Sequence, residues 1–317
     1  MNFISKNRLV IETKKAYRYL FSHNLDLADF PEEIHIETTN RCNLNCRKCS
    51  RTKWRLPNTD MSMSTFIEIL DRIPHPRREI KLFGIGEPLM HPSIFEMIKE
   101  VKKRGSQAAF TTNGYLLEKD KQKGVIESAL DFLRFSVDHI ADNNKEALKN
   151  IEELIRLRGH IKKPLITFNI TVTKENIFEV PKLIQYGKEI GIDAINLICL
   201  VSQFTSDYVQ PLTISERKNF FKRYLRLGKQ LNIPVGGSGF NAKKKLLFFN
   251  FKYKYCPRNV DYVYINQKGD VTPCCWMPTY KIGNIFEQSL NEIWESHRFN
   301  VFRTNWRKIC GDCNLMK

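Results

Sequence analysis

The sequence lacks any long hydrophobic run, and this absence argues against a membrane-spanning protein. Its longest apolar stretches, such as AINLICLV (194–201), are far shorter than the roughly 20 residues that a helix needs to cross a bilayer. Charges interrupt the apolar positions of the first 24 residues, so they contain no signal-peptide core. Glycine and proline, at 15 and 13 of 317 residues, are too sparse for a fibrous or disordered chain. We therefore expect a globular, cytoplasmic protein.

Acidic residues are also scarce relative to basic ones. The chain has 51 Lys and Arg against 34 Asp and Glu, a formal net charge of +17 at pH 7. This balance fits nucleic acid, anionic lipid or a phosphorylated substrate as a partner. One segment, NAKKKLLFFNFKYKY (241–255), concentrates cations and aromatic residues. It is interpreted either as a solvated basic connector or as a segment that faces a ligand or a membrane.

Short apolar runs alternate with amphipathic segments between residues 33 and 201, which is typical of βα units around a parallel sheet. The predicted strands are EIHIETT, IKLFGIG, QAAFTTNG, FLRFSVD, ITFNITVT and AINLICLV. The predicted helices lie near 64–73, 93–104, 116–129, 143–159, 176–190 and 213–231, with Ser64 and Asn176 at N-cap positions. We expect an α/β fold, a partial (β/α)6 TIM-like barrel, with ligands bound beyond the carboxyl ends of the strands.

The pattern changes at NIPVGGSGF (232–240), which is predicted to be a glycine-rich loop at a domain boundary. Beyond it, DYVYI, NQKG and DVTPCC have the signature of a β-hairpin, and a helix is predicted near 289–302. The expected organisation is an N-terminal helical segment (1–30), the barrel (31–233) and a small C-terminal domain of hairpin plus helix (234–317).

Nine cysteines occur in groups with short spacings, which in a reducing compartment indicates metal ligands or reactive thiols more often than disulfides. Cys42, Cys46 and Cys49 form C-x3-C-x2-C directly after the first predicted strand. Three thiolates in a short loop suit an iron–sulfur cluster, and three ligands for four irons leave one iron open. An open coordination position lets a metal centre hold a small molecule. Zinc ligands or core thiols are the alternative.

This spacing, after the first strand of a partial barrel, resembles the radical S-adenosylmethionine (radical SAM) enzymes, and the resemblance covers most of the chain. It implies a [4Fe–4S] cluster whose open iron is chelated by the amino and carboxyl groups of S-adenosylmethionine. It further implies that an electron cleaves the sulfonium to give a 5'-deoxyadenosyl radical, which abstracts a hydrogen atom from the substrate. An external electron donor such as flavodoxin or ferredoxin is implied as a partner.

Other strand-end segments resemble the family's motifs for binding S-adenosylmethionine. GIGEP (84–88) resembles the glycine-glutamate-proline motif that meets the methionine amino group, and TTNG (111–114) and SVD (136–138) end the next two strands. The implied binding residues are Gly86, Glu87, Pro88, Thr112, Asn113, Ser136, Asp138 and Asn169. An N-cap or loop role is the alternative for the two acids. Lys48 departs from the family, which usually has an apolar residue before the third cysteine, and we expect its ammonium to stay in water.

The second cysteine group consists of Cys256, Cys274, Cys310 and Cys313. It resembles the C-terminal SPASM and twitch extensions of radical SAM enzymes, and with five cysteines in the region the one-cluster twitch type fits better. The resemblance implies one auxiliary [4Fe–4S] cluster on these four thiolates, with structural Zn²⁺ as the alternative. Cys275 is left over. Cys275 and Cys199, in the sixth strand, are candidate catalytic thiols or buried small hydrophobes.

Together these features predict a radical SAM oxidoreductase that oxidises a small, anionic or sugar-like substrate by two electrons. A radical epimerase with Cys275 or Cys199 as hydrogen donor is one alternative. A ribosomal-peptide maturase is another, and its leader-recognition domain would be a separate protein because about 30 residues before the first strand are too few for one. A zinc-stabilised basic protein that binds nucleic acid or membrane is the alternative from another class, and nucleic acid is the less expected partner.

Overall fold

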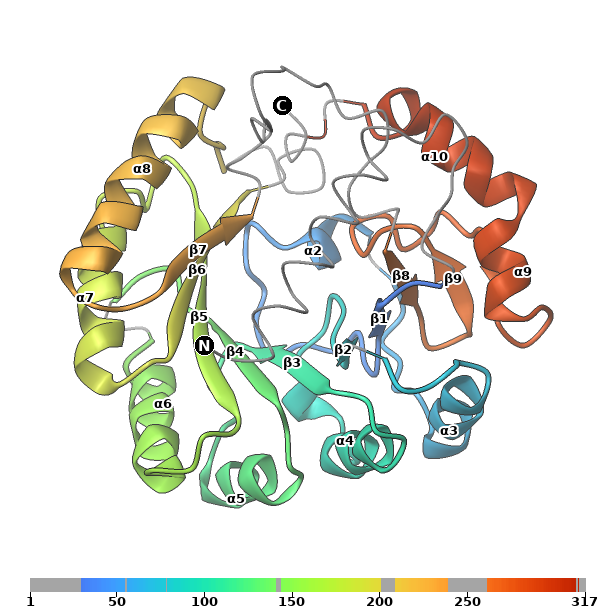
Figure 1. Ribbon diagram of the computed structural model, residues 1–317, viewed down its shortest axis with the longest axis horizontal. Coiled ribbons are helices and arrows are strands. Elements are labelled where there is room, and N and C mark those ends of the chain that lie inside the picture. The colour runs from blue at the N-terminus through green and yellow to red at the C-terminus, as the bar shows by residue number, and fades with distance from the viewer. Residues whose placement is uncertain are drawn as a thin grey trace, which may run out of the picture.

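The computed structural model describes residues 30–54, 56–77, 79–140, 144–200, 209–238, 261–311 and 313. Strands β1 to β7 follow one another across one sheet in chain order, and each pairs in parallel with the next. Their bounds are β1 Glu33–Ile36, β2 Glu79–Lys81, β3 Ala108–Thr112, β4 Phe132–Ser136, β5 Leu165–Val172, β6 Ala194–Cys199 and β7 Val235–Ser238. Chain order and spatial order thus agree, and the sheet curves as a partial barrel (Figure 1).

Helices form an outer layer around the curved sheet (Figure 1). Their bounds are α3 Met63–Asp71, α4 Ile94–Lys103, α5 Lys119–Glu127, α6 Lys145–Arg158, α7 Val180–Ile190 and α8 Ile214–Gln230. A short helix α2 (Ser50–Trp54) and a 3-10 turn η1 (Pro88–Met90) follow β1 and β2. The predicted α/β partial barrel is confirmed.

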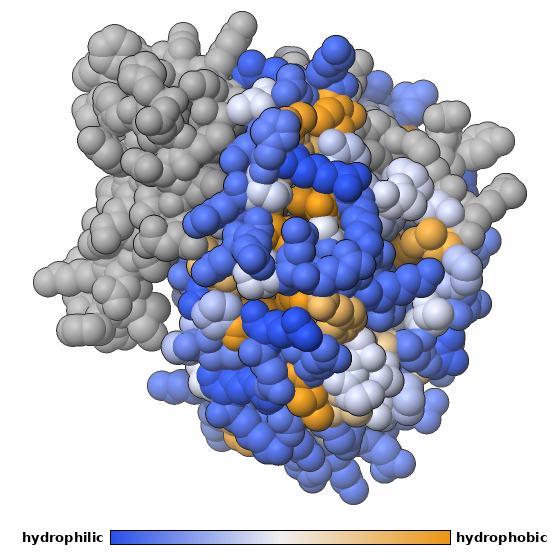
Figure 2. All heavy atoms as spheres, turned by 90° about the vertical axis from the view of Figure 1, so that its right-hand side faces the viewer, coloured by the Kyte–Doolittle hydropathy of each residue, from blue (hydrophilic) through white to orange (hydrophobic). Residues whose placement is uncertain are grey.

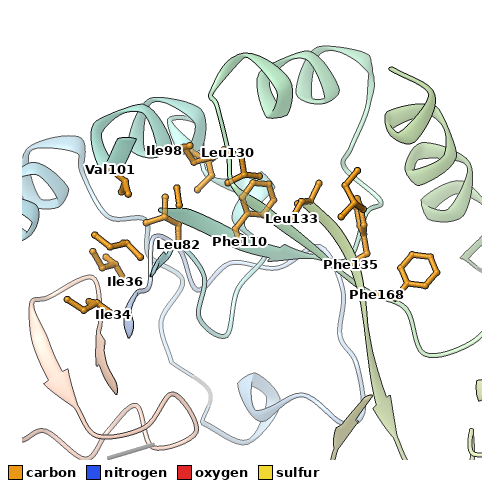
Figure 3. Packing of buried hydrophobic residues seen from close by; sticks show 14 of the residues in the cluster. Ile34, Ile36, Leu82, Ile98, Val101, Phe110, Leu130, Leu133, Phe135 and Phe168 are labelled. Atoms are coloured by element: carbon orange, nitrogen blue, oxygen red, sulfur yellow. The ribbon is translucent and has the colours of Figure 1, made fainter. Parts of the chain in front are cut away.

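The main core lies between the sheet and the outer helices (Figure 3). Phe110, Leu133 and Ile166 are paired across three neighbouring strands, and all three are fully buried on this side. Residues one position later, such as Arg134 and Thr167, point to the inner side of the barrel because side chains alternate along a strand. The inner side is therefore polar, and the sheet presents its polar groups toward the barrel axis.

The C-terminal region joins the same sheet. Strand β8 (Tyr262–Ile265) pairs in parallel with β1 and antiparallel with β9 (Asp270–Thr272), and β10 (Gly283–Asn284) completes this edge. The predicted hairpin is thus present. Two helices, α9 (Leu290–Glu295) and α10 (His297–Ile309), occupy the place of the single predicted helix. The second begins because the Ser296 side chain accepts a hydrogen bond from the Phe299 N–H.

Three local predictions were wrong. Helix α3 is capped by Ser62, not Ser64, because the Ser62 hydroxyl accepts the Thr65 N–H at 3.0 Å. The N-cap residue of α7 is Glu179, whereas Asn176 closes the preceding turn by accepting the Thr173 N–H. The segment predicted as a glycine-rich loop contains β7, paired with β6, so a strand of the barrel sheet follows the proposed domain boundary at residues 233 and 234.

The part of the chain that the structure describes has no helix long and apolar enough to span a bilayer. On the face shown in Figure 2, hydrophilic residues predominate and apolar residues are scattered among them. Scattered apolar residues are usual on protein surfaces.

Asp131 ties together the amino-terminal ends of the strands. Its side chain is buried, accepts the Ala108 N–H at 2.9 Å and forms ion pairs with Lys102 and Lys163. Burial by itself raises the pKa of Asp131, but these donors outweigh burial, and the pKa lies below its ordinary value. The carboxylate is thus more stable in the folded than in the unfolded chain.

We predict that Asp131→Asn lowers the free energy of unfolding by about 2–3 kcal/mol at pH 7, because it leaves two ammonium groups without their buried partner. Urea unfolding measures the loss, with Asp120→Asn as an exposed control. Since the folded pKa is depressed, the stabilisation is present at neutral pH and disappears as the pH falls below about 4, so the two proteins should converge in acid. Equal urea midpoints at pH 7 would contradict this role.

Candidate active site at the barrel mouth

The three-cysteine loop follows β1, as predicted, and hydrogen bonds within the loop hold it. The Arg51 guanidinium donates to the Leu44 carbonyl at 2.9 Å, and the Leu44 N–H donates to Cys42 Sγ at 3.4 Å. The Cys49 N–H donates to the Cys46 carbonyl at 3.0 Å. These turns keep Cys42, Cys46 and Cys49 on one short segment at the carboxyl end of the first strand.

The three thiols influence one another electrostatically. Burial raises the pKa of Cys42 and of Cys46, and the neighbouring Cys49 thiolate raises both further, while the Arg51 charge lowers both. All three side chains keep some exposure to solvent. Within the described residues, no three His, Cys, Asp or Glu side chains already converge as a metal site. The donor set fits a three-thiolate cluster, whose assembly would draw the sulfurs of this loop together.

Glu87 is the centre of a buried polar network, with a side chain only 3% exposed. Its carboxylate accepts the Thr112 hydroxyl at 2.7 Å and the Asn113 N–H at 2.8 Å. It also accepts the Leu89 N–H, so Glu87 is the N-cap of η1, which was the alternative role predicted for this acid. Burial raises the pKa of Glu87 in spite of these donors. The structure thus joins two of the predicted strand-end motifs through one carboxylate.

Gly86 lets this network approach the cysteine loop. A methyl group at Gly86 would lie 2.3 Å from the Thr39 carbonyl oxygen and 2.7 Å from that of Arg41. The Glu87 N–H donates to the same Arg41 carbonyl at 2.7 Å, and Pro88 starts η1 directly behind it. Only glycine fits so close to another backbone segment. The GIGEP segment is therefore packed against the chain that carries the cysteines.

The ends of β4 and β5 supply the remaining predicted residues. Ser136 is exposed and pairs in register with Asn169, whose amide oxygen accepts a hydrogen bond from Asn196 at 3.1 Å. Asn196 was not predicted. Its position opposite Asn169 on the polar inner side could be recognised only once the strand register was known.

Lys48 does not extend into water, and that expectation was wrong. Its ammonium forms an ion pair with Asp138, its side chain is 28% exposed, and burial lowers its pKa to about 8. Asp138 also accepts the Thr171 N–H at 2.6 Å. Lys48 therefore links the cysteine loop to the end of β4, and Asp138 is already engaged by protein groups.

Three of the four cysteines of the second group lie in the described part of the chain, and Cys256 lies outside it. Cys274 follows the end of β9 by two residues, Cys310 is the C-cap of α10, and Cys313 follows three residues later. Cys310 Sγ lies 3.8 Å from the sulfur of Met277, whose N–H donates to the Cys274 carbonyl. The Met277 segment thus brings the hairpin and the end of α10 together.

The two candidate catalytic thiols lie in different surroundings. Cys199 is 3% exposed, pairs with buried Val172 on the helix side of the sheet, and burial raises its pKa to about 12. These surroundings favour the packing interpretation of Cys199. Cys275 is partly exposed and close enough to Glu37 and Tyr264 to raise the pKa of both. It remains a candidate for contact with a substrate.

A partial α/β barrel with three cysteines after its first strand and a cysteine-bearing hairpin beside it defines a class of iron–sulfur enzymes. The Radical SAM superfamily model matches residues 36–187, and the model of the SPASM iron-sulfur cluster-binding domain matches residues 256–314. A protein of Pyrococcus furiosus, named tungsten-containing aldehyde ferredoxin oxidoreductase cofactor-modifying protein, is 31% identical over 320 residues, 89% of this chain and 87% of the relative. The chain belongs to the radical SAM superfamily and carries a C-terminal SPASM domain.

More distant proteins share this organisation. The AdoMet-dependent heme synthase of Methanosarcina barkeri is 24% identical over 92% of this chain and 90% of its own. Streptococcus suis SuiB, solved with its precursor peptide SuiA, has the same fold, with a TM-score of 0.74 and 17% identity over 98% of this chain and 73% of that chain. The predicted cofactors, S-adenosylmethionine, a [4Fe–4S] cluster and an auxiliary iron–sulfur cluster, agree with the two family domains.

Proposed function

We propose that this radical SAM enzyme is an oxidoreductase that removes two electrons from a small, anionic, cofactor-like substrate. The observation that carries the proposal is the pairing of β8 with β1. Neighbouring strands lie about 5 Å apart, so the C-terminal domain begins directly beside the strand that leads into the cysteine loop. A substrate at the barrel mouth would then lie between the two cysteine groups.

When bound, the cofactors supply a 5'-deoxyadenosyl radical and a one-electron acceptor. This pair would balance the two-electron oxidation of an alcohol carbon to a carbonyl. The radical would take one hydrogen atom, the hydroxyl would lose one proton, and the acceptor would take one electron. We assign Cys42, Cys46 and Cys49 to the cluster with the open iron, and Cys256, Cys274, Cys310 and Cys313 to the auxiliary centre. The protein's own task is to fix the strand ends through the Glu87 network.

An anionic substrate is favoured by the charge around the cysteine loop. Between Glu37 and Asp60 the sequence has six Lys or Arg residues and no acid. Arg41 and Lys48 form ion pairs with Asp60 and Asp138, so the other cations would balance the cluster thiolates and attract an anion. The names of the Pyrococcus furiosus and Methanosarcina barkeri relatives describe a cofactor-modifying protein and a heme synthase, which supports a cofactor-like substrate.

Peptide modification is the second candidate, supported by the likeness to SuiB, which was solved with a precursor peptide. For either substrate we propose a cytoplasmic enzyme that receives electrons from a flavodoxin or ferredoxin.

Turnover in deuterated water tests the reaction type. We expect a carbonyl product two hydrogens lighter than the substrate, with one S-adenosylmethionine consumed per turnover and no solvent deuterium at the reacting carbon. Mass spectrometry measures the mass and the deuterium content of the product for the wild type and for the Cys275→Ala and Cys199→Ala variants. An isomer of the substrate that carries one solvent deuterium, and is lost in either variant, would establish epimerisation instead.

A further inference from the structure

Glu37 has a buried carboxyl group, which the proposed reaction does not use, between the barrel and the C-terminal domain. It directly follows β1 and is 1% exposed. Its Oε1 accepts the N–H of Ile85, the second residue of the GIGEP segment, at 3.0 Å. Burial raises the pKa of Glu37, although contacts with Ile85, Tyr264 and Gln267 act in the opposite direction. Burying a carboxyl group costs free energy, so we expect Glu37 to have a specific role.

Tyr264 approaches Glu37 from the SPASM domain. It lies on β8, in register with His35 of β1, and its side chain is fully buried. Burial, and then the Glu37 charge, raise the pKa of Tyr264 well above its ordinary value. In turn, the Tyr264 hydroxyl lowers the pKa of Glu37, so the two groups interact with each other. The contact is therefore close and electrostatic.

Gly84 shows how tightly these groups are packed. A methyl group at Gly84 would lie 2.4 Å from Glu37 Oε1 and 2.5 Å from the Tyr264 hydroxyl oxygen. The Glu37 carboxyl and the Tyr264 hydroxyl therefore occupy the space beside the backbone of the GIGEP segment. Any movement of Tyr264 would be transmitted to this segment through Glu37.

We propose that Glu37 and Tyr264 are positioning residues through which the SPASM domain sets the conformation of the loop 84–88. The contacts form a continuous chain. Tyr264 touches Glu37, Glu37 holds the Ile85 N–H, and two residues later Glu87 binds Thr112 and Asn113. This inference rests on the proposed function only in that the loop helps to bind S-adenosylmethionine.

Hydrogen exchange of the reconstituted protein, without S-adenosylmethionine or substrate, tests the structural part without any catalysis. In Tyr264→Phe, which keeps the ring and removes only the hydroxyl, we expect peptides that cover residues 82–90 to exchange about tenfold faster than in the wild type. Glu37→Ala should speed exchange of the same peptides to a similar extent. Glu37→Gln, which keeps an acceptor for the Ile85 N–H, should show an exchange rate between those of Glu37→Ala and the wild type. Tyr262→Phe is the matched control, because it removes a buried hydroxyl from the same strand, two residues away.

Kinetics of S-adenosylmethionine cleavage by the reconstituted protein, without substrate, test the consequence. Tyr264→Phe should raise KM for S-adenosylmethionine about tenfold and leave kcat nearly unchanged, while Tyr262→Phe behaves as the wild type. Unchanged exchange in Tyr264→Phe, or equal effects of both tyrosine variants, would overturn the proposal. If the wild type cleaves no S-adenosylmethionine, the proposed function fails, whereas the exchange result still decides the positioning role.

Discussion

A variant in which Cys42, Cys46 and Cys49 are all Ala is expected to form no detectable 5'-deoxyadenosine from S-adenosylmethionine under reducing conditions. The three thiols lie on one loop at the strand end, and Cys199 faces the helix side of the sheet, so it offers no replacement ligand. Reconstituted wild-type protein should hold about eight irons, and the variant about four, since each cluster has four. Iron assay and chromatography of the nucleoside measure both quantities.

Cys199→Ala is the control, because it removes a buried thiol of the same barrel. It should retain the iron content and the cleavage activity of the wild type. If the triple variant still forms 5'-deoxyadenosine, the assignment of the three cysteines is wrong.

The second large effect concerns the auxiliary centre. Replacing Cys274, Cys310 and Cys313 by Ala should abolish substrate oxidation yet preserve cleavage of S-adenosylmethionine. A cluster ligated by four thiolates has no open iron, so its task is to accept an electron or to support the fold, and not to bind S-adenosylmethionine. The iron content should fall to about four, and Cys275→Ala should keep about eight.

Thermal unfolding of the same variant separates electron transfer from structural support. If its unfolding temperature is within a few degrees of that of the wild type, the loss of substrate oxidation results from the missing electron acceptor and not from a destabilised fold. Unmodified protein with about four irons and bound zinc would instead favour the structural zinc alternative.

Much of the site could be predicted from the sequence because parallel strands end at a common edge. Once the βα alternation was recognised, GIGEP, TTNG and the cysteine loop had to meet there. The hydrogen bonds of Glu87 to Thr112 and Asn113 are a direct result of that topology. The hairpin was likewise predictable, since its turn chemistry is local.

The features that were missed depend on contacts between distant segments. The ion pair of Lys48 with Asp138 and the contact of Glu37 with Tyr264 follow from which strand ends and loops become neighbours, which no local pattern specifies. Strand β7 was missed because its two glycines give no alternation of apolar side chains, although its pairing with β6 stabilises it. The caps were misplaced because several polar residues stand near each helix start, and only the chain path selects one.

The most direct test of the central claim is the fate of S-adenosylmethionine in reconstituted wild-type protein after one-electron reduction in the absence of oxygen. Mass spectrometry should find 5'-deoxyadenosine and methionine in equal amounts, formed only when both reductant and clusters are present. Intact S-adenosylmethionine, or its conversion to S-adenosylhomocysteine instead, would contradict a radical mechanism at this barrel mouth.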